Sequence, residues 1–251
     1  MRVSISKVKL FKACRRAYEF KYIHELESIQ KADSLVVGGN YHKKLEDLYT
    51  TGDFDMSDLS KESAMALAYK RYIYPKFKVD CVESYESCPL GEHTLIGYVD
   101  GISEDAKLVE HKTTSLDPEE YIYNLQWDEQ ILAYMGMTGT RDVYYTICKK
   151  PTIRQRKGES DEDFFWRMVD WYDTDTERKI TVELITRTDE DVEAFMKDLK
   201  STVDDMENPV CLYKNTSYCN AWGRRCEYAP ICMYYDPNEE YVGFQKREEK
   251  R

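Results

Sequence analysis

The chain has 251 residues, of which 42% are hydrophobic and 33% are charged, a composition typical of a globular protein and sufficient to bury a core. Its net charge of −11 argues against a protein that simply coats nucleic acid, but not against an enzyme whose site contains metal-binding carboxylates. No stretch has the apolar character of a secretory signal or a membrane span. We therefore expect a cytoplasmic, intracellular protein without a membrane partner.

The first eighty residues are expected to be mainly helical. Apolar residues recur at helical spacing over residues 7–24, and again over 40–50 after the glycine pair Gly38–Gly39. A third helix is expected over residues 61–74, ended by Pro75.

Strand patterns begin at Val82. Alternation and turn residues predict strands over 82–88, 94–102, 107–113, 142–149 and 178–187, with helices over 118–137 and from 188 to about 203. The simplest architecture is an α/β domain whose central mixed sheet is flanked by helices. We expect one domain over residues 1–251, with a helical part (1–80), a catalytic core (81–203), a cysteine-rich segment (204–235) and a charged tail (236–251).

Two carboxylates and a lysine in this core indicate a catalytic site. Strand alternation projects Glu110 and Lys112 to one side of the sheet, and a short turn could bring Asp100 beside Glu110. Neighbouring carboxylates repel each other unless a cation neutralises them, and Mg²⁺ or Mn²⁺ prefers oxygen ligands. The metal would lower the pKa of a bound water, and Lys112 would either orient that water or stabilise the phosphate charge in the transition state. The alternative is a surface hairpin with a Glu–Lys pair.

In these motifs the chain resembles the RecB-like branch of the PD-(D/E)XK nucleases, which includes phage and CRISPR-associated exonucleases and has a restriction-endonuclease-like core. That branch places a histidine on a helix upstream of the catalytic hairpin, and the resemblance makes His42 a metal ligand; a helical histidine bonded to Glu46 is the alternative. It also carries a Q-x-x-x-Y signature, which matches Gln130 and Tyr134. The four-residue spacing puts both on one helix face, where they could contact DNA, although Tyr134 could instead be a core residue.

The cysteines are unevenly spread, with four of the eight between Cys211 and Cys232, which suggests a metal or an iron–sulfur cluster. The family resemblance pairs an N-terminal cysteine with three near the C-terminus around a [4Fe–4S] cluster. Here Cys14, Cys219, Cys226 and Cys232 would be the ligands, with Cys211 as the alternative to Cys219. Structural zinc or free buried thiols are the other interpretations.

The resemblance therefore implies a DNA exonuclease that depends on Mg²⁺ or Mn²⁺. The 21 tyrosines could stack on unpaired bases, so we expect it to act on single-stranded ends. The expected catalytic residues are Asp100, Glu110 and Lys112, and the expected metal ligands are His42, Asp100, Glu110 and His111. Five basic residues between Lys149 and Lys157 are either a DNA contact or a solvated loop. The alternatives are a DNA-end-binding subunit with protein partners in a recombination or adaptation complex, or an RNA-cleaving nuclease.

Overall fold

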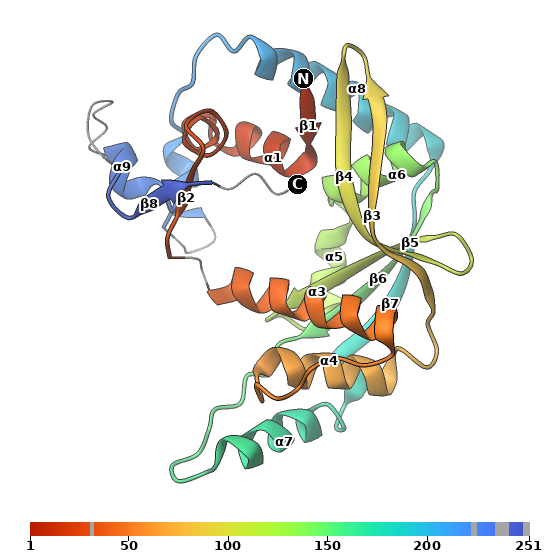
Figure 1. The fold of residues 1–251 in the computed structure, drawn as a ribbon. Coiled ribbons are helices and arrows are strands. Elements are labelled where there is room, and N and C mark those ends of the chain that lie inside the picture. The colour runs from red at the N-terminus through yellow and green to blue at the C-terminus, as the bar shows by residue number, and fades with distance from the viewer. Residues whose placement is uncertain (31–32, 222–224, 234–240, 248–251) are drawn as a thin grey trace. The chain divides into compact units, whose positions relative to one another are not determined.

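A computed structural model describes residues 1–30, 33–221, 225–233 and 241–247 (Figure 1). The chain forms two compact units, each built from separate segments. Unit 1 consists of Met1–Ala32, Cys88–Ile96 and Met196–Arg251, and unit 2 consists of Asp33–Ser87 and Gly97–Phe195. Of the predicted charged tail, only residues 241–247 fall within the described part. None of the described helices is long and apolar enough to cross a membrane.

Unit 2 contains a mixed sheet. Its strands are β3 (Val79–Leu90), β4 (His93–Ser103), β5 (Leu108–Thr114), β6 (Asp142–Lys149) and β7 (Ile180–Thr186), and the ends of β3 and β4 that lie within residues 88–96 belong to unit 1. The β4–β5 and β6–β7 pairs are antiparallel, β5 and β6 are parallel, and β3 pairs with β4. Because parallel neighbours need a crossover, the chain leaves the sheet between β5 and β6 and returns through two helices. The predicted mixed sheet flanked by helices is confirmed.

Helices cover both faces of this sheet (Figure 1). They are α3 (Asp33–Thr51) and α4 (Lys61–Tyr72) on one side, with α7 (Asp161–Trp171) packed on α4, and α5 (Pro118–Leu125) and α6 (Glu129–Thr138) on the other. Consecutive side chains of β5 contact helices on opposite faces of the sheet. The His111 ring packs against Tyr49 of α3 and Tyr69 of α4, whereas Lys112 contacts Gln130 of α6.

Several helix boundaries differ from the predicted ones. The helix expected over 118–137 is interrupted before Asp128, whose side chain caps α6 by accepting the Gln130 N–H. Gly38 and Gly39 lie inside α3 rather than before it. Helix α7 and the short strands outside the main sheet were not predicted. The last long helix, α8, covers Asp189–Glu207.

Unit 1 joins the first and last parts of the chain. The helix predicted over 7–24 is divided into α1 (Ile5–Ala13), α2 (Arg15–Tyr18) and a π-helical turn (Glu19–Ile23), because Cys14 is extended. Strand β1 (Arg2–Ser4) runs parallel to residues 94–96, and β2 (Leu26–Ser28) pairs with β8 (Phe244–Lys246). The Tyr228 ring stacks on Phe20 and on Phe244. Two short helices, η3 (Thr216–Tyr218) and α9 (Ala229–Met233), lie between α8 and β8.

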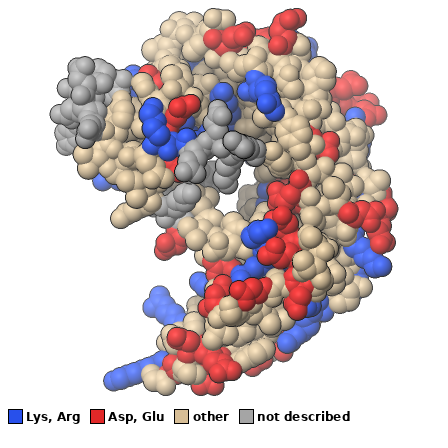
Figure 2. Space-filling view, viewed as in Figure 1, with Lys and Arg blue, Asp and Glu red and all other residues tan. Residues whose placement is uncertain are grey.

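The α3–α4 pair forms the main apolar core of unit 2. Leu45 and Leu48 on α3 are almost fully buried against Met65 and Tyr69 of α4. The outer surface of α3 is polar, with Lys43 paired to Glu46, and Figure 2 shows acidic and basic side chains intermixed there. Burial of one face is therefore what holds α3 in place.

We expect Leu48→Ala to lower the free energy of unfolding by about 2–5 kcal/mol, because the site is fully buried and a cavity would remain. Leu35→Ala is the matched control: it lies on the same helix but is 71% exposed, so its effect should stay within about 0.5 kcal/mol. Urea unfolding followed by circular dichroism measures both. Equal losses in the two variants would contradict this packing of α3.

Candidate active site

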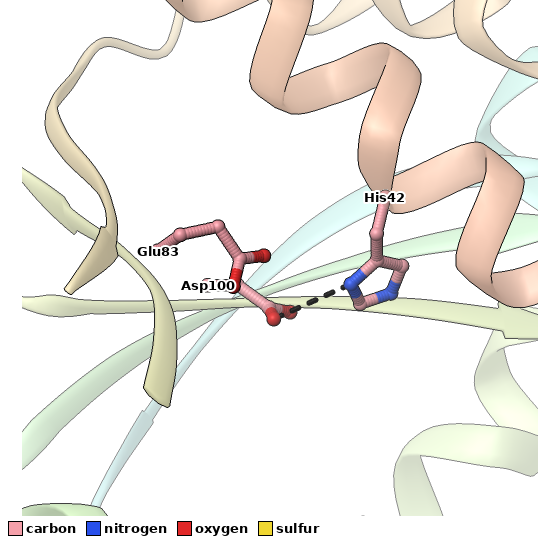
Figure 3. Close-up of side chains that lie close together, drawn as sticks. All are labelled: His42, Glu83 and Asp100. Atoms are coloured by element: carbon pink, nitrogen blue, oxygen red, sulfur yellow. Dashed lines mark ion pairs between the residues drawn. The ribbon is translucent and has the colours of Figure 1, made fainter. Parts of the chain in front are cut away.

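Three side chains from three elements of unit 2 converge. The donor atoms of His42, Glu83 and Asp100 all lie within 4.8 Å of one another. Figure 3 shows His42 reaching from α3 toward the two carboxylates on β3 and β4. His42 Nδ1 is 3.3 Å from Asp100 Oδ1. One imidazole nitrogen with two carboxylates is a donor set that suits a divalent cation such as Mn²⁺ or Mg²⁺.

Sequence reasoning missed Glu83. This residue has a φ of 50°, a left-handed conformation that costs a non-glycine residue about 1–3 kcal/mol. The distortion interrupts the regular alternation of β3 at the point where the Glu83 carboxylate meets Asp100. Partial burial and the Asp100 charge raise the pKa of Glu83. A charged residue in the strand beside Asp100 was the only available signal, and alternation alone could not indicate where its side chain points.

The predicted Glu110–Lys112 pair is formed on the central strand β5. Lys112 Nζ donates to Glu110 Oε1 at 2.6 Å, and Glu110 Oε2 is buried without a hydrogen-bond partner among the described residues. Burial, and then the charge of Asp100, raise the pKa of Glu110 to about 7. Burial alone would lower the pKa of Lys112, but Glu110 and Asp128 raise it. The lysine therefore stays charged beside a carboxylate that is costly to ionise.

The backbone of His111 holds the Asp100 carboxylate by a hydrogen bond. Its N–H donates to Asp100 Oδ2 at 2.7 Å. Its ring lies on the other face of the sheet, buried, with Nδ1 2.5 Å from Thr146 Oγ1. Burial lowers the pKa of His111 to about 4, so the ring is neutral near pH 7. The His111 ring meets the His42 ring edge-on, with centroids 6.0 Å apart, but its nitrogens are not among the donor atoms that converge at His42, Glu83 and Asp100. The expected metal-ligand role of His111 stays a prediction.

Gln130 and Tyr134, both on α6, form a hydrogen-bonded chain that ends at Lys112 of β5. Gln130 Oε1 accepts from Lys112 Nζ at 3.2 Å, and Gln130 Nε2 donates to the Tyr134 hydroxyl at 2.8 Å. A Cβ at Gly97 would come within 2.9 Å of the Tyr134 ring, so this ring needs a glycine opposite it. Both side chains therefore line the surroundings of Lys112.

The sulfur atoms of unit 1 form a second group. The Asn215 backbone N–H donates to Cys14 Sγ at 3.3 Å, and Cys219 Sγ lies 3.8 Å from the Asn215 carbonyl oxygen. The Cys226 N–H donates to the Cys219 carbonyl at 2.8 Å. Burial, with contributions from Cys14 and Cys219, raises the pKa of the Cys226 thiol to about 11.

The fourth cysteine of this group, Cys232, packs with Cys14 and Cys226 in one apolar cluster. Cys211 is exposed, and the remaining cysteines, Cys81, Cys88 and Cys148, belong to strands β3 and β6. The structure thus brings Cys14, Cys219, Cys226 and Cys232 into one region.

The sequence matches the model of the PD-(D/E)XK nuclease superfamily over residues 2–73 and 63–233. The chain belongs to this superfamily. The matched ranges include Asp100, Glu110 and Lys112, the residues predicted to be catalytic. No curated protein sequence matches the chain.

Several solved structures are distantly similar. A putative exonuclease from Eubacterium rectale is 12% identical, with 95% of this chain and 90% of that chain covered and a TM-score of 0.49. A phage-related exonuclease from Haemophilus somnus 129PT is 17% identical, with 75% and 90% covered and a TM-score of 0.36. An alkaline exonuclease from Laribacter hongkongensis is 15% identical, with 82% and 88% covered and a TM-score of 0.38. The family assignment rests on the family model.

We expect His42→Ala and Glu83→Gln each to weaken Mn²⁺ binding by at least about tenfold, because even residues that only support metal ligands contribute about 10- to 100-fold. Glu86→Gln is the matched control: it is on the same strand, where Glu86 contacts Ser84. Calorimetric titration with Mn²⁺ measures the three affinities. Unchanged binding by Glu83→Gln would remove Glu83 from the ligand set.

Proposed function

We propose that this PD-(D/E)XK nuclease is a divalent-metal-dependent exonuclease that hydrolyses DNA phosphodiesters from single-stranded ends. The observation that carries the proposal is the buried Glu110 carboxylate. One of its oxygens accepts from Lys112, and the other has no hydrogen-bond partner within the described residues. Buried polar atoms in folded proteins usually have a partner, and this one is a carboxylate oxygen beside a second carboxylate, Asp100, so it supports a cation as its missing partner.

The residues present fit such an ion. Asp100 and Glu110 would hold it, with His42 and Glu83 as further ligands from α3 and β3. When bound, a divalent cation polarises the phosphate and supplies an activated water. It would also offset the carboxylate repulsion that raises the pKa of Glu110.

The chain's own residues would prepare the site for the phosphate. The His111 N–H fixes one oxygen of Asp100, which leaves the His42 side of that carboxylate for a ligand. Lys112 supplies a positive charge where negative charge develops on the phosphate. Gln130, held by Tyr134, restricts the position of the Lys112 ammonium. We expect 5′-phosphate products, as in the family this chain resembles.

We expect Lys112→Ala to lower cleavage of end-labelled DNA by about 100-fold or more, the usual cost of losing a group that stabilises transition-state charge. The control is Lys61→Ala, an exposed lysine at the start of α4, which should cleave like the wild type. Mn²⁺ or Mg²⁺ should be required, and EDTA should abolish activity.

The choice of nucleic-acid substrate distinguishes a DNA exonuclease from an endonuclease, an RNA nuclease and a DNA-end-binding subunit. Matched single-stranded DNA, duplex DNA and RNA oligonucleotides, labelled at one end, distinguish exonuclease ladders from internal cuts and DNA from RNA preference. If the folded wild type binds DNA ends but cleaves none of them with either metal, the proposal is wrong and a DNA-end-binding subunit becomes the better account.

We further propose that Cys14, Cys219, Cys226 and Cys232 hold a [4Fe–4S] cluster. Four thiolates are the usual ligands of such a cluster, and the Asn215 N–H directed at Cys14 Sγ is the kind of hydrogen bond that tunes it. The positions of the four thiols support the cluster, because Cys14, Cys226 and Cys232 pack in one group and Cys219 lies beside Asn215, which also contacts Cys14.

We expect anaerobically purified wild type to contain about four iron and four sulfide ions per chain and to be coloured. Cys14→Ser should lose most of the iron, whereas Cys81→Ser, on an exposed position of β3, should retain it. Iron, sulfide and zinc analysis with visible spectroscopy measures this. One zinc ion per chain with no sulfide would contradict the cluster and favour a structural zinc site.

A further inference from the structure

Two large aromatic side chains remain exposed at the end of α5. Tyr123 is 62% exposed and Trp127 is 63% exposed. Their ring centroids are 5.2 Å apart, with an interplanar angle of 70°. The four-residue spacing brings both rings to one side of the chain. The same segment buries Pro118 and Leu125, so its contacts with the core do not use the aromatic pair.

This pair adjoins the catalytic residues. Trp127 directly precedes Asp128, whose Oδ2 is 3.6 Å from Lys112 Nζ. Tyr121, two residues before Tyr123, is half-buried; burial raises its pKa, and the nearby charge of Lys112 acts to lower it. The Cα atoms of Trp127 and Asp128 are about 3.8 Å apart because the two residues are consecutive. Trp127 is therefore the chain neighbour of a residue that contacts Lys112.

Trp127 also borders a groove of about 580 Å³, whose walls include Ile122, Gln126 and Leu184. Arg187 supplies a positive charge at this groove. One of its guanidinium nitrogens donates to the carbonyl oxygens of Leu125 and Gln126, at 3.1 Å each, in the turn that carries Trp127. Asp191 lies on the same wall and accepts the Thr188 N–H at the start of α8. Aromatic faces beside a guanidinium complement a base and its phosphate.

We propose that Tyr123 and Trp127 form a stacking site for an unpaired nucleobase next to the phosphate held at Lys112. The proposal rests on the proposed function, because it assigns part of the substrate to this groove. Bases in a duplex already stack on their neighbours, so a single strand or a frayed end is what presents a free face. The site would therefore favour single-stranded nucleic acid.

Affinity for short oligonucleotides tests the site without cleavage. In a Lys112→Ala background with Mn²⁺, anisotropy of labelled single-stranded DNA should show a loss of about 5- to 150-fold for Trp127→Ala, which corresponds to about 1–3 kcal/mol for one stacked base. Trp127→Phe should retain most of the affinity, and duplex binding should change little. The matched control is Trp166→Ala on α7, where Trp166 is 45% exposed and contacts Phe165.

An abasic scan separates stacking from a structural effect. A single abasic position moved along the oligonucleotide should weaken binding at one or two positions in protein that retains Trp127. In Trp127→Ala these same positions should cause no further loss, because the stacking partner is already absent. A variant that was only misfolded would instead bind every oligonucleotide more weakly by a similar factor.

Equal losses in Trp127→Ala and Trp166→Ala, or an abasic profile that Trp127→Ala leaves unchanged, would overturn the stacking site. A changed sedimentation coefficient with unchanged DNA affinity would assign the pair to a protein interface instead. If the wild type cleaves DNA and Trp127→Ala binds normally, only this inference fails. If Trp127→Ala loses binding while the wild type cleaves nothing, the nuclease proposal fails and the stacking site stands.

Discussion

Repulsion among carboxylates is the constraint around which the catalytic half of this protein is organised. Glu83, Asp100 and Glu110 approach one another in a chain whose net charge is already −11. Buried like charges destabilise a fold unless each has a partner. Lys112 provides one, and the His111 amide with the His42 ring provides another. The negative charge that remains unpaired at Glu110 is the one that the proposed cation would offset.

The sheet makes this concentration of charge possible. Strand β5 lies between β4 and β6, so its neighbours fix its backbone on both sides. Its two faces then perform different tasks. One face presents Glu110 and Lys112, while on the other the His111 ring packs with Tyr49 and Tyr69, whose hydroxyls are 2.6 Å apart. A rigid aromatic layer thus supports the strand from behind, and the polar side chains in front gain fixed positions.

The alternation over residues 107–113 was sufficient to predict the Glu110–Lys112 arrangement, because a central strand follows the two-residue period closely. Glu83 could not be predicted in the same way, since its left-handed φ breaks that period. Helix α7 was missed although its start is recognisable: Ser160 caps it by accepting the Asp163 N–H, and acidic residues fill its first turn. The proximity of Cys14 to Cys219 depends on contacts between distant parts of the chain, which no local pattern contains.

The interleaving of the two units has a consequence for biosynthesis. All segments of unit 2 end at Phe195, so its core and catalytic residues can assemble while residues 196–251 are still being made. Unit 1 cannot, because Phe20 packs on Tyr228 and β2 pairs with β8. Strand β1 can pair with residues 94–96 early, but Phe20 and β2 must wait, without their partners, until residues 228 and 244–246 have been made. A nascent chain truncated after unit 2 would expose this waiting segment to chaperones and proteases before it exposed the nuclease core.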